Sequence, residues 1–295
     1  MGKIETLIIC NRIYKNWVHV LYSLRRKKKI IEVSLRNGKT FRAPYETVYF
    51  INKVAKRNQY RIYAFFDINS GVLEFTYEGR QVKLKHYQNG ILSGDYDVFL
   101  GIYDFLEPIK GNTVVDVGAN IGDSTLYFAV KGASRILALE PYKYPYNMLV
   151  ENVKLNNFDK NVITINAGYG EDGVIELEDN ITSPSIELKE CKGGVRTPIL
   201  SLRTLLEQYS DILKGELLLK MDCEGSEYNL LKESKDTLQR FDRMVIEYHK
   251  GYEKLNKKLE ECGFKCSYTK PIEQYEEIKK KNVVQGYLYA KFCGK

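Results

Sequence analysis

Three acidic side chains follow one short apolar run in the C-terminal half of the chain. Residues 216–221 are typical of a buried strand, and Asp222, Glu224 and Glu227 come directly after them. Carboxylates gathered at one strand end are unfavourable unless they accept protons or bind a cation. The pattern therefore predicts acid–base chemistry or a divalent cation such as Mg²⁺. The alternative is a set of solvated acids, with Glu227 capping the next helix.

His249 is a further candidate for acid–base chemistry. It follows the apolar residues 243–248, and of the three histidines it is the one that we expect at the end of a sheet strand. A histidine or a carboxylate in such a place can accept a proton from a hydroxyl group. We therefore predict Asp222, Glu224 and His249 as the catalytic residues, with Asp222 or His249 as the general base. A purely structural histidine is the alternative.

A glycine-containing segment, residues 116–124 (DVGANIGDS), offers a place for a cofactor. Gly118 would let the backbone turn sharply and let a ligand approach it, and Gly122 would permit close packing where a helix begins. The start of that helix offers free N–H groups to a polar ligand. A glycine-containing turn alone is a weak signal, since it can be purely structural.

Glu140 strengthens the prediction of a cofactor site. It ends the next expected strand, about twenty residues further on, where an acid can accept both hydroxyls of a ribose. Asn120 stands where a dinucleotide-binding turn needs its second glycine to approach a pyrophosphate. S-adenosylmethionine has no phosphate, so it tolerates a side chain there. The predicted cofactor-binding residues are Asp116, Gly118, Asn120, Gly122, Asp123, Ser124, Glu140 and Asp222.

The elements that must position these residues alternate from about residue 96 onward. We expect strands at 113–117, 135–139, 162–166, 216–221, 243–248, 264–268 and 283–292, and helices at 98–106, 124–130, 147–155, 200–209, 228–232 and 252–262. Alternation of this kind predicts an α/β fold with a Rossmann-like, mostly parallel sheet. No helix is expected before the last strand, so that strand should be antiparallel. The segment 172–198 should help to form the pocket for the substrate that accepts the transferred group, called the acceptor pocket below.

Residues 1–95 predict a separate, small α+β region without a catalytic motif. Apolar spacing over residues 4–24 favours one helical face, and residues 48–58 and 62–66 favour a short helix and a strand. Two hairpins should turn at Asn37-Gly38 and Glu78-Gly79. The basic run at 25–29 suits a helix end, or a surface that contacts a membrane or RNA. We expect this region to contribute acceptor binding or oligomer contacts.

Bulk properties favour a protein of the cytoplasm. The chain has 295 residues and a formal net charge of +7, which attracts anionic partners only mildly. Its six cysteines form no CxxC pair and no zinc-binding spacing, so we expect reduced thiols. No apolar run approaches the ~18 residues that span a bilayer. The N-terminus lacks the pattern of a signal peptide.

Residues 114–264 resemble the FkbM-type family of class I S-adenosylmethionine-dependent methyltransferases. The segments VVDVGANIGDST, LALEPYKYPYNMLVENVKLNN, LLLKMDCEGSEYNLL and VIEYHKGYEKL occur in the family's order and approximate spacing. The resemblance implies methyl transfer, usually to a hydroxyl oxygen and often on a sugar or natural product. Arg203 departs from the family, which usually has an acidic residue there.

The resemblance also implies roles for individual residues. It places Gly118, Asn120 and Gly122 around the cofactor and Glu140 on its ribose. It places Asp222, Glu224 and Glu227 near the transfer site, and Glu247 and His249 match the acid and the histidine of the family's fifth strand.

The sequence therefore predicts O-methylation of a sugar, glycolipid or other small molecule, with S-adenosylmethionine as cofactor. An RNA methyltransferase that binds RNA through its N-terminal region is the alternative. Against RNA, the place of the Asn/Asp-Pro-Pro-aromatic motif of many base-modifying enzymes reads Asp222-Cys223-Glu224-Gly225. A non-enzymatic interaction protein is a third possibility, and the intact turn and acidic residues argue against it. Mg²⁺ and a homo-oligomer are left open.

Overall fold

The computed structural model describes residues 2–85, 95–178, 188, 190–269 and 284–294. Internal contacts divide the chain into two compact units. The N-terminal unit comprises Met1–Ile102 with Lys154–Asn157, and the C-terminal unit comprises Tyr103–Val153 with Phe158–Lys295. Each unit is described by itself below. Within the described ranges, no helix has the length and apolar character needed to cross a membrane.

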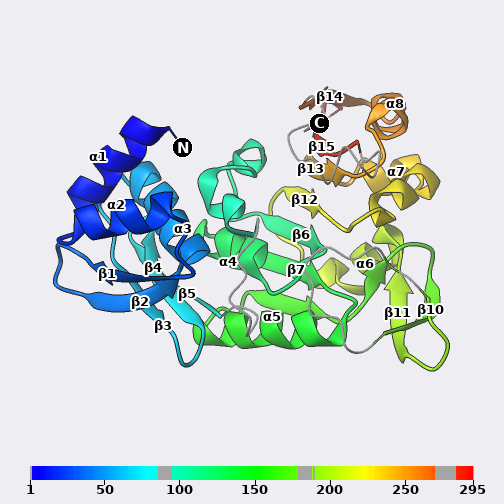
Figure 1. Ribbon diagram of the computed structural model, residues 1–295. Helices are drawn as coiled ribbons and strands as arrows, with labels where there is room; N and C mark the ends of the chain where they lie inside the picture. Colours follow the sequence, from blue (N-terminus) through cyan, green and yellow to red (C-terminus); the bar gives the residue numbers. More distant parts are fainter. Residues whose placement is uncertain (1, 86–94, 179–187, 189, 270–283, 295) are drawn as a thin grey trace. The chain divides into compact units, whose positions relative to one another are not determined.

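A seven-stranded sheet forms the centre of the C-terminal unit, and its strand order is β14-β15-β13-β12-β6-β7-β8 (Figure 1). The strands are β6 (Thr113–Val117), β7 (Arg135–Leu139), β8 (Val162–Ile165), β12 (Leu217–Met221), β13 (Arg243–Tyr248), β14 (Phe264–Tyr268) and β15 (Gly286–Phe292). The first five run parallel, and β15 lies antiparallel between β13 and β14. The predicted Rossmann-like sheet with an antiparallel last strand is confirmed.

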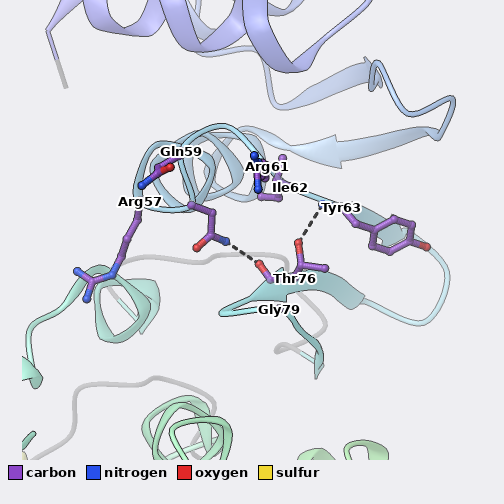
Figure 2. Close-up of a pocket in the computed structure, with 8 residues that line it drawn as sticks. Arg57, Gln59, Arg61, Ile62, Tyr63, Thr76 and Gly79 are labelled. Carbon is purple, nitrogen blue, oxygen red and sulfur yellow. Dashed lines mark hydrogen bonds between the residues drawn. The ribbon is translucent and has the colours of Figure 1, made fainter. Parts of the chain in front are cut away.

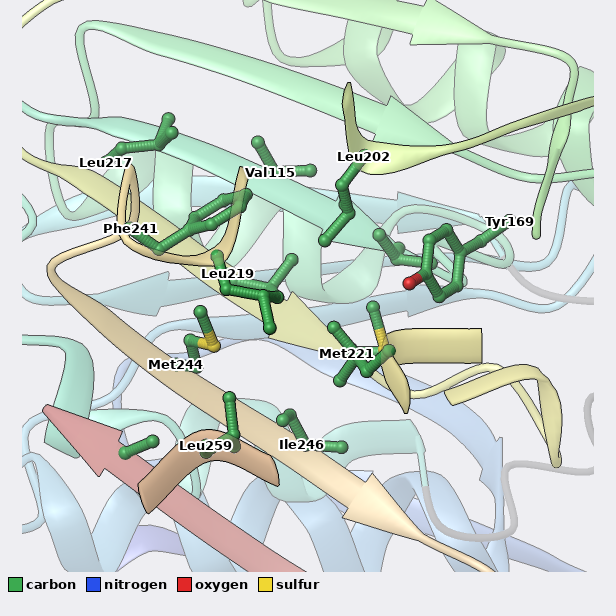
Figure 3. Packing of buried hydrophobic residues seen from close by; sticks show 14 of the residues in the cluster. Val115, Tyr169, Leu202, Leu217, Leu219, Met221, Phe241, Met244, Ile246 and Leu259 are labelled. Atoms are coloured by element: carbon green, nitrogen blue, oxygen red, sulfur yellow. The ribbon is translucent and has the colours of Figure 1, made fainter. Parts of the chain in front are cut away.

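The central strands are apolar because both faces of the sheet are covered. Every residue of β6, β12 and β13 is buried, as is typical of parallel sheets. Leu219 of β12, Ile246 of β13 and Leu259 belong to one buried cluster (Figure 3). This core fixes the strand ends, where the predicted site residues lie.

Helices follow the strands at most of the predicted places. They are α4 (Asp123–Val130), α5 (Lys143–Leu155), α6 (Leu202–Gln208), α7 (Lys235–Leu238) and α8 (Glu253–Glu261), with a 3₁₀ turn η3 (Ser210–Ile212). The helix predicted at 228–232 is instead a 3₁₀ helix, η4 (Ser226–Lys232). The helix predicted at 98–106 was also wrong, because that segment holds two 3₁₀ turns, η1 (Asp95–Leu100) and η2 (Asp104–Leu106). Gly101, at a φ of 99°, separates them.

A second, three-stranded sheet was not predicted. Its order is β10-β11-β9, with β9 (Gly168–Tyr169), β10 (Gly173–Leu177) and β11 (Val195–Leu200). It lies within and beside the segment 172–198 that was expected to help form the acceptor pocket. Pro198 lies inside β11, and a proline weakens the sequence signal of a strand.

The N-terminal unit is a small α+β structure. It holds α1 (Lys3–Ile13), α2 (Trp17–Arg25), α3 (Tyr45–Arg57), a hairpin of β1 (Ile30–Ser34) and β2 (Thr40–Pro44), and a sheet of β3 (Ala64–Asp67), β4 (Val72–Tyr77) and β5 (Arg80–Lys85). The β1–β2 and β4–β5 hairpins turn where the sequence predicted. The expected single helical stretch over 4–24 was wrong, because Asn16 bonds instead to β1 through Glu32 O and Ser34 N.

Candidate active site

The turn after β6 has left-handed backbone at three positions. Gly118, Asn120 and Gly122 have φ values of 74°, 46° and 94°. A Cβ atom on Gly118 would lie 1.7 Å from the carbonyl oxygen of Asp222, so this glycine permits the close approach of β12 as well as the turn. A Cβ atom on Gly122 would lie 2.7 Å from Leu149 Cδ1 of α5, in accord with the expected close packing where α4 begins.

Glu140 reaches back from the end of β7 to this turn. Its carboxylate accepts hydrogen bonds from the backbone N–H groups of Asn120 (3.0 Å) and Tyr142 (2.9 Å). Burial raises the pKa of Glu140 to about 7. A carboxylate offers roughly four acceptor sites, so two remain for the hydroxyls of a ribose. The turn and Glu140 together fit the nucleoside part of S-adenosylmethionine.

A buried ion pair between Asp116 and Lys220 stabilises the turn. Asp116 has no exposed surface, and its carboxylate accepts hydrogen bonds from Ser124 Oγ (2.8 Å) and Thr125 Oγ1 (2.7 Å). Lys220 Nζ lies 3.1 Å from Asp116 Oδ1 and donates to the carbonyl oxygen of Gly118 at 2.7 Å. We therefore expect Asp116 and Ser124 to act on a cofactor through the turn, without touching it.

Lys220 is a residue that the sequence prediction missed. The signal was a lysine inside an otherwise apolar strand, which is rarely tolerated without a partner. Burial alone would lower the pKa of Lys220, but Asp116, Asp222 and Asp123 raise it. Burial raises the pKa of Asp123 to about 7, although Lys220 opposes that shift. The positive charge of Lys220 thus stabilises three neighbouring carboxylates, those of Asp116, Asp123 and Asp222.

Asp222, Glu224 and His249 come together at the ends of the adjacent strands β12 and β13. One ligand atom from each lies within 4.8 Å of the other two, and Asp222 and Glu224 are partly exposed. His249 Nε2 lies 3.4 Å from Glu224 Oε2. The three side chains predicted to be catalytic thus face a single point.

Glu227 orients the histidine. It is fully buried and accepts hydrogen bonds from the backbone N–H of Gly225 (2.7 Å) and of His249 (2.9 Å). Its Oε1 also lies 3.0 Å from His249 Nδ1. With a proton on Nδ1, the other ring nitrogen is turned toward Asp222 and Glu224. Only the bond from the N–H of Gly225 fits the capping role expected for Glu227, and the other contacts are to His249.

The imidazole of His249 is enclosed by acids. Its Nε2 is buried and has no hydrogen-bond partner among the described residues, and the carboxylate of Glu224 lies beside it at ion-pair distance. Burial alone would lower the pKa of His249, but Glu227, Asp222 and Glu224 raise it to about 9. The ring is therefore an imidazolium at neutral pH, unless another cation takes the place of the proton.

The structure also places Glu247 and Arg203, both singled out from the sequence. Burial, and then the charge of Asp222, raise the pKa of Glu247 to about 8, and Gln285 donates a hydrogen bond to its carboxylate. Arg203 forms an exposed ion pair with Glu207 at 2.9 Å. Arg203 thus forms a surface contact, which explains how an arginine is accommodated where the family usually has an acid.

The N-terminal unit holds a pocket of its own, with a volume of about 680 Å³ (Figure 2). Asn58 Nδ2 and the backbone N–H of Tyr63 bond to Thr76, which ties the pocket wall to β4. The lining residues are Arg57, Asn58, Gln59, Arg61, Ile62, Tyr63, Thr76 and Gly79. None of them belongs to the predicted site, and the lining offers no carboxylate or imidazole for proton transfer.

Comparisons with known proteins identify the family. The model of the methyltransferase FkbM domain matches residues 116–266, which is half of the chain. Solved structures similar to this chain include TYW2 from M. jannaschii in complex with AdoMet, with 23% identity over 75% of this chain and 86% of that one, at a TM-score of 0.41. Methyltransferase FkbM from Methylobacillus flagellatus is 18% identical over 61% of this chain and 43% of that one, at a TM-score of 0.40.

A tRNA m1G37 methyltransferase from M. jannaschii is 14% identical over 77% of this chain and 58% of that one, at a TM-score of 0.41. No curated protein matches the sequence. The family match covers the turn, Glu140, the acidic end of β12 and His249. This chain therefore belongs to the FkbM family of S-adenosylmethionine-dependent methyltransferases.

Proposed function

We propose that this enzyme methylates a hydroxyl oxygen of a sugar, a glycolipid or another small molecule, and that Asp222, Glu224 and His249 act on that acceptor. The observation that carries the proposal is the position of Asp222. Its backbone N–H bonds to Val117 O at 3.1 Å, and its carbonyl group abuts Gly118. The acidic site therefore directly adjoins the turn that we assign to the cofactor.

For this reaction the protein must position the donor and the acceptor and remove one proton from the acceptor. S-adenosylmethionine, when bound, supplies a methyl group whose carbon–sulfur bonding pair stays with the sulfur. The residues of the turn and Glu140 would hold the donor, and orientation of this kind can remove several kcal/mol of barrier. Asp222 would take the proton of the acceptor hydroxyl, which makes the acceptor oxygen a better nucleophile. General-base catalysis of this kind contributes about 10²–10⁴ in rate.

His249 has an orienting role in this scheme. Because Glu227 and the neighbouring acids keep it protonated at neutral pH, its Nε2–H can donate to the acceptor oxygen or to Asp222. Glu224 balances its charge at 3.4 Å. The base is then Asp222, whereas the sequence left the choice between Asp222 and His249 open.

A divalent cation is the second arrangement that these residues fit. The buried Nε2 of His249 without a hydrogen bond, together with one carboxylate oxygen each from Asp222 and Glu224, offers three ligands. A bound Mg²⁺ would supply Lewis-acid polarisation of the acceptor hydroxyl and so lower its pKa. Chelator should then abolish turnover and added Mg²⁺ should restore it. If chelator has no effect, Asp222 acts without a metal.

The decisive experiment first needs an acceptor. Transfer of a labelled methyl group from S-adenosylmethionine to panels of sugars, glycolipids, small-molecule alcohols and RNA identifies the acceptor class. Labelled RNA as the sole product would establish the alternative function instead. On the verified acceptor, we expect Asp222→Asn and His249→Ala to lower turnover strongly while calorimetry shows little change in cofactor affinity. Near-wild-type turnover in both variants would show that the transfer site lies elsewhere.

The N-terminal unit has no assigned part in this chemistry. None of the proposed catalytic or cofactor-binding residues lies in it. We propose that it contributes acceptor binding or contacts between copies of the chain. Analytical ultracentrifugation of the full chain, and acceptor affinity measured with changes confined to that unit, test the two contributions separately.

A further inference from the structure

The chain's excess of positive charge lies entirely in the N-terminal unit. Residues 1–102 hold 18 lysines and arginines against 8 acidic residues, whereas the rest of the chain holds 27 against 30. Five of the 18 form the run at 25–29, and all five are exposed. A surface with this excess of positive charge favours a partner with many negative charges.

α1 is apolar on two faces. Ile9, Cys10 and Ile13 are buried in the unit, whereas Ile4 and Ile8 are 76% and 43% exposed. Leu7 is also exposed, and both Leu7 and Ile8 lie one helical turn from Ile4, on the same side of the helix. A helix that is apolar on opposite sides is normally covered on both of them. Nothing in the described part of the unit covers the second face.

α2 extends this apolar surface toward the basic run. It packs against α1 (Figure 1), and its Val18 and Tyr22 are exposed. Five of the nine large apolar side chains exposed in the described ranges therefore belong to these two short helices. Lys28 Nζ and the Arg26 guanidinium lie 5.3 and 5.8 Å from the centre of the Tyr22 ring. Apolar and cationic side chains thus meet at Tyr22.

We propose that α1, α2 and residues 25–29 form a face that docks onto an anionic lipid bilayer. Nucleic acid would neutralise the cations but would leave isoleucine and valine in water. A bilayer surface satisfies both groups, because apolar side chains enter the acyl boundary while cations contact anionic headgroups. Tyrosine is enriched at such boundaries. The one acid of α1, Glu5, is paired with Lys56 and does not oppose this docking.

Vesicle flotation with the full chain tests the proposal. We expect binding to phosphatidylcholine vesicles that contain phosphatidylserine, weakening as salt is added, and little binding to phosphatidylcholine alone. Changing three cations of the run to glutamine should weaken binding about 100-fold, since each contributes about a factor of five. The variant is Arg25→Gln, Arg26→Gln and Lys28→Gln. The matched control is Lys254→Gln, Lys257→Gln and Lys258→Gln on α8, which should bind as the wild type does.

A second pair of variants tests the apolar part. Ile4→Ser with Leu7→Ser should weaken binding about tenfold or more. Ile68→Ser with Val174→Ser removes equally exposed apolar side chains elsewhere and should leave it unchanged. Cofactor affinity should be the same in all four variants. A negative result for membrane docking would therefore leave the proposed methyl transfer unaffected. Absence of binding to the anionic vesicles, or equal loss in the controls, overturns the proposal. So does loss of RNA affinity in the glutamine variant without loss of vesicle binding.

Discussion

Replacement of Glu140 by glutamine tests the cofactor site without knowledge of the acceptor. The carboxylate accepts two backbone N–H groups, and the proposal adds two ribose hydroxyls. A glutamine side chain keeps the shape but has one oxygen and one NH₂ group. Because Oε1 and Oε2 each accept one of the backbone N–H groups, the NH₂ group must face one of them, and the ribose hydroxyl on that side loses its acceptor.

The size of the effect follows from the bonds involved. A hydrogen bond to a charged group contributes about 1.5–3 kcal/mol. The loss of one such bond weakens affinity for S-adenosylmethionine by about 10- to 150-fold. Isothermal titration calorimetry measures this directly. Glu207→Gln, on the exposed face of α6, is the control and should bind as the wild type does. If Glu140→Gln keeps full affinity, the ribose is not at Glu140 and the assignment of the turn is refuted.

The same carboxylate makes cofactor affinity depend on pH. Burial raises the pKa of Glu140 to about 7, and the ribose hydroxyls bind the ionised form. Binding therefore lowers this pKa and releases a proton, so affinity rises with pH up to about 7 and is constant above it. One unit below the pKa, about one-tenth of the molecules are ionised and affinity is about tenfold weaker. Glu140→Gln should abolish this dependence.

Three further predictions concern the surroundings of the site. Gly118→Ala should lower the free energy of unfolding by about 3 kcal/mol or more, because its Cβ meets the end of β12, whereas Gly38→Ala, at a φ of 94° with nothing within 4 Å, should cost about 1–2 kcal/mol. Lys220→Met should destabilise the fold by about 3–5 kcal/mol in thermal denaturation, because it leaves the buried carboxylate of Asp116 without its cation. A smaller loss would show that the ion pair does not stabilise the fold. Glu227→Gln should lower the pKa of His249 from about 9 in an NMR titration, and an unchanged pKa would show that Glu227 does not orient the ring.

The sequence predicted the site best where local pattern decides the structure. Apolar runs mark β6, β7, β12 and β13, and Glu140, Asp222 and His249 directly follow β7, β12 and β13. Parallel strands in neighbouring positions bring those ends to one edge of the sheet. The approximate location of Asp222, Glu140 and His249 could therefore be inferred from strand order alone.

Contacts between distant residues could not be predicted in this way. Glu227 and His249 are 22 positions apart, and their bond depends on the exact offset of two strands. The pairing of Lys220 with Asp116 depends on the register of β12 against β6. The break between α1 and α2 likewise depends on a tertiary contact. The side chain of Asn16 bonds to β1, which follows later in the chain. Tertiary bonds of this kind override local helix propensity.

Backbone atoms set the separation between the turn after β6 and the acidic end of β12. Gly118 lies against the carbonyl group of Asp222, and the N–H of Asp222 bonds to Val117. A change of side chain in the segment around β10 and β11, which we propose shapes the acceptor pocket, would therefore leave this backbone contact between the turn and the acidic site in place. An enzyme built in this way can acquire a new substrate by mutation without losing its ability to transfer the methyl group. Under this proposal, its reactivity and its selectivity depend on separate parts of the chain.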